Sequence, residues 1–562
     1  MSYNGLVADE PEQICNLFAK FFGSVYEQSD EILDVESSPF NDICNTVLSD
    51  YHISKDCIIA ALKSLDITKG AGPDGIPPFF FKHTAESIAT PLHILYNKSL
   101  QEGTVPNRWK LANVTPVYKS GNKNVVSNYR PISLLSTLAK VFERLIHNYI
   151  YPFFHNIIIE QQHGFVKKRS TTSNLVLFTN FLFESMDQRI QVDAVYTDFC
   201  KAFDKVDQEI LLQKLAFNGI RGNLLRWLSS YVKNRSQQVF INGFTSEVFK
   251  VSSGVSQGSI LGPLLFVIFI NDIDQCFKHT HCLLYADDLK VYSAITSVVD
   301  CLKMQEDLNR LTAYCKKNKL YLNLNKCKFI SYTKKCKNIN YTYSLCNTLL
   351  EKVSVIRDLG IYMDSKLNYH VHVDHIVGKA FKLYGFVMRT SIPFKRPSSY
   401  LLLYKSLIRS QLEYATPIWN PFYLNSKNKL EAVQRRFLRS MHYRCFRSKS
   451  SYSSLLLKYD LPTLDRRRNL LDVMLLHNIV HQKFNCMELT RQIQLHVPAR
   501  SCHIRGTRKS ALFALKRCKT HAGERAPLWR VMRLYNDLFI DIDLFAASSA
   551  SFRRSVVRAM QM

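Results

Sequence analysis

The sequence lacks any apolar stretch long enough to cross a membrane. Its most apolar run covers residues 264–270, far short of the ~20 residues that a spanning helix needs. The N-terminus also lacks the basic start and apolar centre of a secretory leader, so we expect a protein of the cytoplasm, the nucleus or both, and not a secreted one. The 15 cysteines show no paired spacing, which indicates reduced thiols rather than a disulfide framework.

Zinc-binding patterns and repeats are scarce as well. The nearest candidate zinc cluster comprises Cys502, His503, Cys518 and His521. Its spacing departs from that of zinc fingers and knuckles, so we expect no zinc site there. We find no internal repeat and no low-complexity tract. Because 46% of the residues are hydrophobic, the chain can bury real cores, and its length suggests two to four domains.

Acidic residues are rare in the last third of the chain. Residues 371–562 hold 34 lysines and arginines against 11 acids, whereas residues 1–370 hold 40 and 35. A basic surface attracts a polyanion, most often a nucleic acid. A basic tail that serves only solubility is the alternative, but runs of large apolar residues at 401–404 and 470–476 indicate that this region folds.

Hydrophobic periodicity gives a coarse map of the elements. It predicts helices over residues 11–27, 53–65, 134–151 and 207–215 and a strand over 192–198. Residues 30–50 are polar and read as a loop, and residues 68–75 contain too much Gly and Pro for a helix or a central strand. Two short β-rich runs, 282–285 and 289–292, predict a hairpin. Beyond residue 371 the pattern is mostly helical, so we predict an α+β protein with more than one subdomain.

Two adjacent acids, Asp287 and Asp288, lie at the tip of the predicted hairpin. Adjacent carboxylates raise each other's pKa, and a divalent cation such as Mg²⁺ removes that cost. An Asp pair in a turn is by itself common, because turns favour Asp. Asp198 ends the predicted strand 192–198 and would supply a third carboxylate if it lies beside the hairpin. Such a trio can form a two-metal site for phosphoryl or nucleotidyl transfer.

The motifs around these acids resemble those of LINE-type (non-LTR, jockey-like) retrotransposon reverse transcriptases. Residues 195–207 resemble their motif A, and motifs B to E resemble residues 254–263, 285–288, 322–328 and 358–361. Upstream, residues 69–75, 128–134 and 162–170 resemble the fingers motifs, and the order and spacing agree over roughly residues 55–375. Weaker similarity continues at 412–419, 434–437 and 461–467.

The resemblance implies a right-hand polymerase fold of fingers, palm and thumb, with an additional basic helical region at the C-terminus. The domains we expect are an N-terminal helical extension (1–54), fingers (55–185), a palm with motifs A to E (186–370), a thumb (371–480) and a basic C-terminal region (481–562). The activity implied is RNA-directed DNA polymerase. Its partners would be an RNA template, a DNA primer and deoxynucleoside triphosphates, without a membrane and in an oligomeric state that the sequence leaves open.

The resemblance also implies a metal site. Asp198, Asp287 and Asp288, helped by the backbone carbonyl of Phe199, would bind two Mg²⁺ ions, with Mn²⁺ as a possible substitute. Lys326 is the candidate general acid that protonates the leaving pyrophosphate, although lysines near strand ends are common without such a role.

The remaining candidates would bind substrate. Phe203 occupies the position of the family's sugar gate, where its ring would collide with a ribose 2′-OH; a plain core phenylalanine is the alternative. Gln257 and Gly258 would lie against the template and the incoming base pair, or form a simple turn. Arg130 and Lys119 are candidates for the triphosphate, and Lys119 could equally be a solvated surface lysine. Asp204 is as compatible with a salt bridge or a cap as with the site.

Three other functions share these features. A catalytically silent or host-adopted RNA-binding remnant would keep the fold, but the three intact acids argue against it. An intron-encoded maturase is disfavoured by the absence of a maturase segment, and an RNA-dependent RNA polymerase by the bulky residue at 203. We also find no endonuclease or ribonuclease H pattern, so we expect the chain to lack its own DNA-nicking activity.

Overall fold

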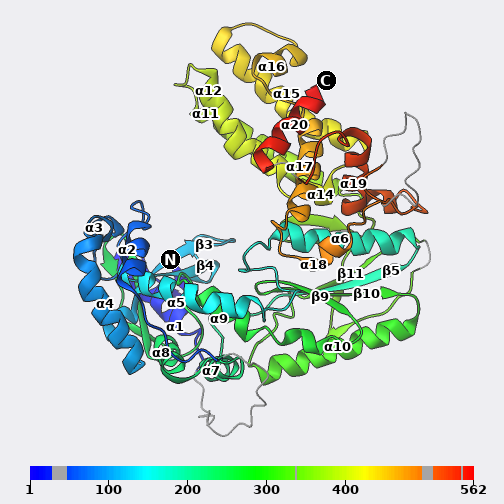
Figure 1. Ribbon diagram of the computed structural model, residues 1–562. Coiled ribbons are helices and arrows are strands. Elements are labelled where there is room, and N and C mark those ends of the chain that lie inside the picture. The colour runs from blue at the N-terminus through cyan, green and yellow to red at the C-terminus, as the bar shows by residue number, and fades with distance from the viewer. Residues whose placement is uncertain (28–46, 336–337, 497–510, 546–547, 562) are drawn as a thin grey trace.

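The computed structural model describes residues 1–27, 47–335, 338–496, 511–545 and 548–561 (Figure 1). Helices and strands are intermixed up to about residue 364, and helices dominate beyond it. The prediction of an α+β fold with a helical C-terminal region is therefore confirmed. Within the described residues, no helix is both long enough and apolar enough to cross a membrane.

A five-stranded sheet forms the centre of the molecule. Its strand order is β14 (Glu351–Lys352), β11 (Lys328–Tyr332), β5 (Gln191–Thr197), β10 (Asp288–Ile295) and β9 (His281–Tyr285). Side chains that alternate along β5 enter two different cores. Val195 belongs to the core that includes α10 (Val298–Lys317), while Val192 and Ala194 belong to the core that includes α6 (Thr171–Asp187). The two helices cover opposite faces of the sheet (Figure 1), so β5 is apolar on both sides.

A second sheet lies to the left of the first in Figure 1. Its order is β4 (Tyr129–Leu134), β3 (Leu111–Tyr118), β6 (Arg235–Ile241) and β7 (Phe244–Thr245), and β8 (Phe249–Val251) also pairs with β6. Strands β3 and β6 are parallel and more than 100 residues apart. A division of the chain at residue 185 therefore separates in sequence strands that this sheet joins in space.

Helices surround the second sheet and connect it to the first. They are α1 (Pro11–Gly23), α2 (Lys55–Lys63), α3 (Pro78–His83), α4 (Ala85–Glu102), α5 (Thr137–His155), α7 (Gln208–Phe217), α8 (Gly222–Val232) and α9 (Leu261–Phe269). All residues of α9 except Pro263 are buried, because the helix packs between α5 and α7. The predicted helices are confirmed with shifted ends: the one expected from residue 134 begins at Thr137, since Leu134 ends β4.

The predicted loop over residues 30–50 lies mostly outside the described residues, and no helix or strand forms between residues 68 and 75. Short elements complete the first two thirds of the chain: β1 (Ser2–Tyr3), β2 (Leu6–Val7), the 3-10 turns Asn107–Trp109, Val126–Asn128 and Ile273–Cys276, β12 (Ser344–Leu345) and β13 (Thr348–Leu349).

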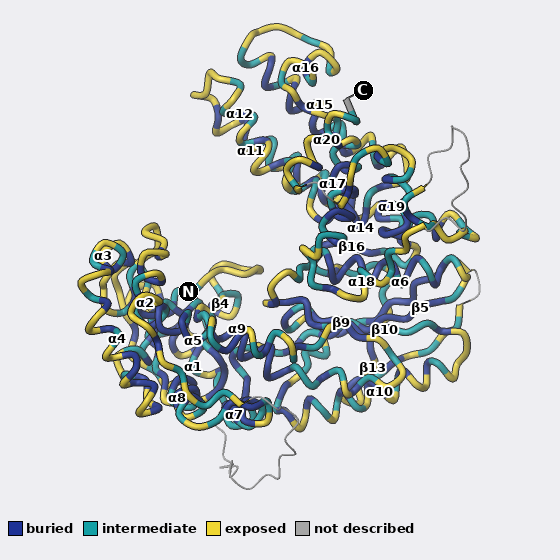
Figure 2. Tube along the Cα trace, in the orientation of Figure 1, coloured by how far each residue is buried: buried dark blue, intermediate teal, exposed yellow. Residues whose placement is uncertain are grey.

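The hairpin of β15 (Val355–Asp358) and β16 (Ile361–Asp364) leads into the C-terminal helices, which stand above the first sheet in Figure 1. These helices are α11 (His370–Thr390), α12 (Pro397–Leu403), α13 (Ser410–Glu413), α14 (Thr416–Trp419), α15 (Leu424–Phe446), α16 (Tyr452–Lys458), α17 (Leu464–Val480), α18 (Met487–Arg491), α19 (Pro527–Leu538) and α20 (Ser549–Gln561). A π-helical segment, Tyr404–Arg409, follows α12, and a 3-10 turn, Gly523–Arg525, precedes α19. Buried residues line the centre of this bundle, and exposed ones mark α11, α12 and α16 (Figure 2).

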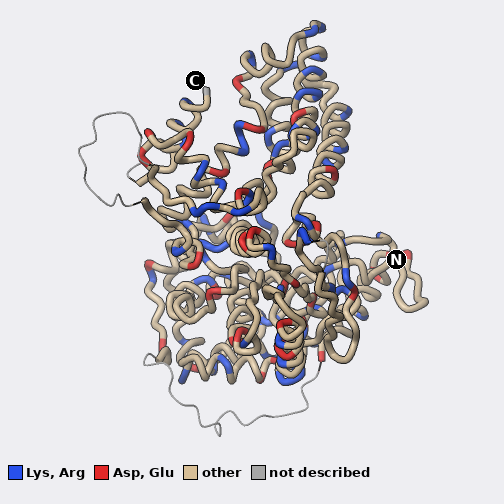
Figure 3. Tube along the Cα trace, turned by 90° about the vertical axis from the view of Figure 1, so that its right-hand side faces the viewer, with Lys and Arg blue, Asp and Glu red and all other residues tan. Residues whose placement is uncertain are grey.

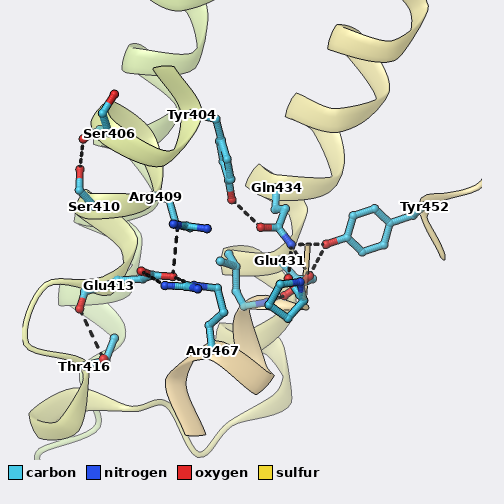
Figure 4. A network of polar contacts seen from close by, with 12 residues as sticks. Tyr404, Ser406, Arg409, Ser410, Glu413, Thr416, Glu431, Gln434, Tyr452 and Arg467 are labelled. Atoms are coloured by element: carbon cyan, nitrogen blue, oxygen red, sulfur yellow. Dashed lines mark hydrogen bonds and ion pairs between the residues drawn. The ribbon is translucent and has the colours of Figure 1, made fainter. Parts of the chain in front are cut away.

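The three weaker motifs of the C-terminal third meet in one polar network (Figure 4). Gln434 accepts a hydrogen bond from the Tyr404 hydroxyl at 2.7 Å and donates to the Pro462 carbonyl at 3.0 Å. Arg467 forms a two-contact ion pair with Glu413. Gln434 is fully buried, and a buried polar group needs its partners because an unpaired one costs ~1–3 kcal/mol. These motifs therefore join the C-terminal helices to one another.

Candidate active site

Strand register places the three predicted acids side by side. Leu289 in β10 pairs with Thr197 in β5, and Asp288 pairs with Tyr285 across the hairpin. Asp198 is the next residue after Thr197, so it lies opposite the hairpin tip that carries Asp287 and Asp288. Ala286 turns this tip with a φ of +57°, a left-handed conformation that L-residues adopt in tight turns.

The electrostatics of the acids follow from this proximity. Burial raises the pKa of Asp288 to about 6, and repulsion from Asp287, Asp358 and Asp198 adds to the rise. Burial and the charge of Asp198 likewise raise the pKa of Asp287. A nearby cation stabilises the charged form of carboxylates that repel one another in this way.

Lys326 supplies one such cation. Its ammonium lies 2.8 Å from a carboxylate oxygen of Asp198. Among the residues that the structure describes, no group of three or more His, Cys, Asp or Glu side chains converges as a metal cage. The oxygen donors suit Mg²⁺, but Lys326 engages one of them. The acids thus fit a divalent ion in chemistry and strand position without forming a closed cage.

The segment that carries Lys326 is attached to the end of β5. The Cys200 amide donates to the Tyr321 carbonyl, and the Asn323 amide donates to the Asp198 carbonyl, both at 2.7 Å. Phe199 is buried between them and bridges to Leu322. The predicted role of the Phe199 carbonyl stays a prediction, while Lys326 lies within direct reach of the acids.

Lys119 and Arg130 approach the acids from the second sheet. Lys119 follows β3, Arg130 lies in β4, and both side chains are exposed. Partial burial is the largest cause that lowers the pKa of Lys119, and the charges of Arg130 and Lys326 lower it further. Asp198 and Asp287 act on Lys119 in the opposite direction. Both predicted triphosphate ligands therefore lie in the electrostatic neighbourhood of the acids.

Phe203 stacks on Phe266 with ring centroids 4.4 Å apart and meets the edge of Phe165 at 5.9 Å. Its ring is partly exposed. A ring held by two aromatic neighbours has a fixed orientation, which a steric gate requires and which a core residue would also show.

Gln257 and Gly258 contact Asp204 and Ser133, and Ser133 lies in β4. Gln257 donates from Nε2 to Asp204 at 2.7 Å, and its carbonyl accepts from the Ser133 amide at 2.7 Å. Gly258 has a φ of +124°, and a Cβ there would lie 2.4 Å from the Ser133 carbonyl oxygen. Only glycine fits this approach. Asp204, which the sequence left open, is a buried partner of Gln257, and burial raises its pKa to about 6.

Sequence reasoning did not identify Gln162 as a site residue. Its side chain is buried and grips the hairpin tip: Oε1 accepts from the amides of Ala286 (2.9 Å) and Gly164 (2.7 Å), and Nε2 donates to the Ala286 carbonyl (3.2 Å). A Cβ on Gly164 would lie 2.1 Å from the Ala286 nitrogen. The motif at 162–165 therefore positions the hairpin tip, and its glycine was the one local signal of close backbone approach.

A buried ion pair below the hairpin was also missed. Lys290, two residues after Asp288, lies 2.5 Å from Asp358, and the side chains are 4% and 5% exposed. Asp358 belongs to β15, and the pair faces a pocket of about 220 Å³ that Asp198, Asp288 and Lys326 also line. The 358–361 motif is thus connected to the acids through Lys290.

Parts of the chain are similar to known proteins. The family described as reverse transcriptase (RNA-dependent DNA polymerase) matches residues 118–343. The probable RNA-directed DNA polymerase from transposon BS of Drosophila melanogaster is 27% identical over 468 residues, covering 78% of this chain and 50% of that protein. The RNA-directed DNA polymerase from mobile element jockey of the same species is 25% identical over 443 residues, covering 76% and 46%.

The chain spans about half the length of the curated relatives it matches. A solved structure of apo telomerase from Candida tropicalis, truncated from its C-terminal domain, aligns with a TM-score of 0.32 and 13% identity over 50% of this chain and 59% of that one. That score is too low to support an inference. The family match contains the three acids and every candidate substrate residue.

Proposed function

Residues 118–343 match the reverse transcriptase family, and on that premise we propose that the chain is the RNA-directed DNA polymerase of a non-LTR retrotransposon. It would extend a DNA primer on an RNA template from deoxynucleoside triphosphates, in the cytoplasm or the nucleus. The observation that carries the proposal is the register of β5 and β10, which sets Asp198 opposite Asp287 and Asp288. Its fold would divide into the fingers, palm, thumb and terminal regions expected from the sequence.

Asp198, Asp287 and Asp288, with the Phe199 carbonyl, would hold two Mg²⁺ ions, or Mn²⁺ in their place. Bound there, such ions lower the pKa of an attacking hydroxyl and stabilise charge on the departing phosphate oxygens. The raised pKa values of Asp287 and Asp288 support this assignment, because acids that repel one another gain most from a divalent ion.

Arg130, Lys119 and Lys326 would each have a separate role in binding and releasing phosphate groups. Arg130 can grip the triphosphate with two parallel hydrogen bonds, and Lys119 adds a point charge beside it. Lys326 would leave Asp198 when the metals bind and donate a proton to the leaving pyrophosphate. The charges of Arg130, Lys326, Asp198 and Asp287 all act on Lys119, which supports this arrangement.

Phe203 would exclude the ribose 2′-OH, and Gln257 with Gly258 would contact the nascent base pair. The fixed Gln257–Asp204 hydrogen bond and the tight approach of Gly258 to β4 support a rigid floor under that pair. Arg435, Arg436 and Arg439 are exposed on α15 and would contact the duplex backbone, giving affinity that depends on salt. Lys and Arg are frequent in the C-terminal helices (Figure 3).

A primer-extension assay on an RNA template, with Mg²⁺ and deoxynucleotides, tests the proposal. We expect the wild type to extend the primer and Asp287→Asn to lose nearly all extension while it still binds primer–template. Asp56→Asn, an exposed acid near the start of α2, is the matched control and should extend normally. A wild type that binds primer–template but does not extend it with either Mg²⁺ or Mn²⁺ would favour the silent remnant instead.

A further inference from the structure

Two adjoining pockets open at the end of the first sheet that is remote from the catalytic acids. One, of about 430 Å³, lies between the C-terminal end of α6 and residues 516–519. The other, of about 660 Å³, lies between residues 186–190, the chain after β11 at 333–335, and residues 520–522. Both are lined by Ile190. Together they form one concave surface, which we call the β5-start surface.

The β5-start surface is strongly basic. Six exposed cations line it: Arg189, Lys334, Lys335, Lys516, Arg517 and Lys519. None of the six is in an ion pair with a described residue. Six cations against two lining acids, Glu184 and Asp187, leave a positive potential that attracts a polyanion.

The acids on this surface are already engaged. Asp187 accepts hydrogen bonds from the amides of Lys519 (3.1 Å) and Thr520 (2.7 Å) and from the Thr520 hydroxyl. Glu184 accepts from Asn180 and from the Trp529 indole. Both carboxylates therefore hold the wall of the pocket together through these hydrogen bonds.

Distance separates this surface from the catalytic acids. Residue 190 precedes β5, and Asp198 follows it. At ~3.3 Å per residue, the strand places the two ends roughly 25 Å apart. A nucleic acid held by Asp198 and Asp287 would reach the β5-start surface only with a portion that lies outside the polymerase site.

We propose that the β5-start surface binds the phosphodiester backbone of nucleic acid outside the polymerase site. This goes beyond the proposed polymerase function, which requires no contact there. Side chains that neutralise phosphates read no bases, so binding is independent of sequence and falls with salt. The bound strand can be RNA or DNA, since both carry the same backbone charge.

The experiment compares two triple variants with the same change of charge. Lys334→Gln/Lys335→Gln/Arg517→Gln removes three cations from the surface. Lys303→Gln/Lys316→Gln/Lys317→Gln is the control and removes three exposed lysines from α10, on the opposite face of the sheet. Fluorescence anisotropy measures the binding of a labelled single-stranded RNA and of a single-stranded DNA of equal length as the salt concentration is raised.

Each lost phosphate contact should reduce the slope of log K against log salt by ~0.7 for a single strand, which is roughly a fourfold loss of affinity at 0.15 M salt. The surface variant should therefore lose about 2 from the slope and bind ~50-fold more weakly, on RNA and DNA alike. The control should stay within a few-fold of the wild type. If the triple variant fails to fold, Arg517→Gln alone should give the fourfold loss.

Wild-type affinity and slope in the surface variant would overturn the proposal, as would a loss confined to RNA, since backbone charge is common to both strands. An equal loss in the α10 control would also overturn it, because the effect would then reflect net charge. Primer extension tests the polymerase function and not this surface. Failure of the wild type to extend a primer would refute the polymerase function, whereas the proposal for the β5-start surface depends on the binding measurements alone.

Discussion

Replacing Gln162 with methionine tests how the catalytic hairpin is held. The side chains have similar length, but methionine can neither accept from the amides of Gly164 and Ala286 nor donate to the Ala286 carbonyl. Three hydrogen bonds of 2.7 to 3.2 Å are lost at a residue that is 1% exposed. Water cannot easily replace them at such a buried position.

The magnitude follows from the groups left unpaired. Each buried backbone group without a partner costs ~1–3 kcal/mol, so leaving the hairpin in place would cost roughly 3–9 kcal/mol. We expect the tip at Ala286 to move instead and to find water. A shift of ~1 Å in the reacting groups can reduce the rate ~100-fold, and Asp287 and Asp288 follow directly after Ala286.

Steady-state primer extension measures this effect. Gln162→Met should lower kcat about 100-fold, while the Kd for primer–template, measured by anisotropy, stays within a few-fold of the wild type. Gln161→Met is the matched control, because the side chain of Gln161 makes no hydrogen bond with any described residue. If Gln162→Met retained a kcat close to that of the wild type, or if Gln161→Met lost as much, the positioning role of Gln162 would be refuted.

Three further predictions concern residues near the site. Phe203→Ala should raise the incorporation of ribonucleotides relative to deoxynucleotides, because the ring stacked on Phe266 would no longer meet the 2′-OH; unchanged sugar discrimination in single-nucleotide extension would remove that role. Burial raises the pKa of Asp204 to about 6 from 3.8, so the folded state holds its proton more tightly and stability falls as pH rises from about 4 to 6, by up to ~3 kcal/mol. Asp204→Asn should therefore raise Tm at pH 8 but not at pH 4, and an equal shift at both pH values would contradict the reasoning. Lys290→Met leaves the charge of Asp358 buried and should cost ~3–5 kcal/mol in urea unfolding, whereas Lys290→Met/Asp358→Leu should recover most of it; a double variant as unstable as the single one would show that the pair is not the cause.

Local patterns determined much of this molecule. The apolar run of β5 and the paired runs around residues 285–289 predicted a strand and a hairpin, because residues that alternate or run apolar over four to eight positions suit a sheet. The same runs placed Asp198 at a strand end and Asp287 at a turn. The family motifs then indicated that these ends meet, which the register of β5 with β10 confirms.

Long-range pairing lay beyond the sequence. Nothing local indicates that β6 pairs with β3 across more than 100 residues, because the free energy of strand pairing depends on neighbours that come together only in the folded chain. The ends of the predicted helices also differ from the observed ones by a few residues. The helix predicted from residue 134 begins at Thr137, because Leu134 belongs to the preceding strand β4.

The supporting residues were decided by tertiary structure alone. Gln162 in a polar motif and Lys290 in a strand carry no pattern that names their partners, since a buried hydrogen bond or ion pair forms only when the fold excludes water from both groups. The sequence by itself determined which side chains could do the chemistry, because residue type and strand position are local. The folded chain alone decided how those side chains are held, because only packing brings Gln162 to Ala286 and Asp358 to Lys290.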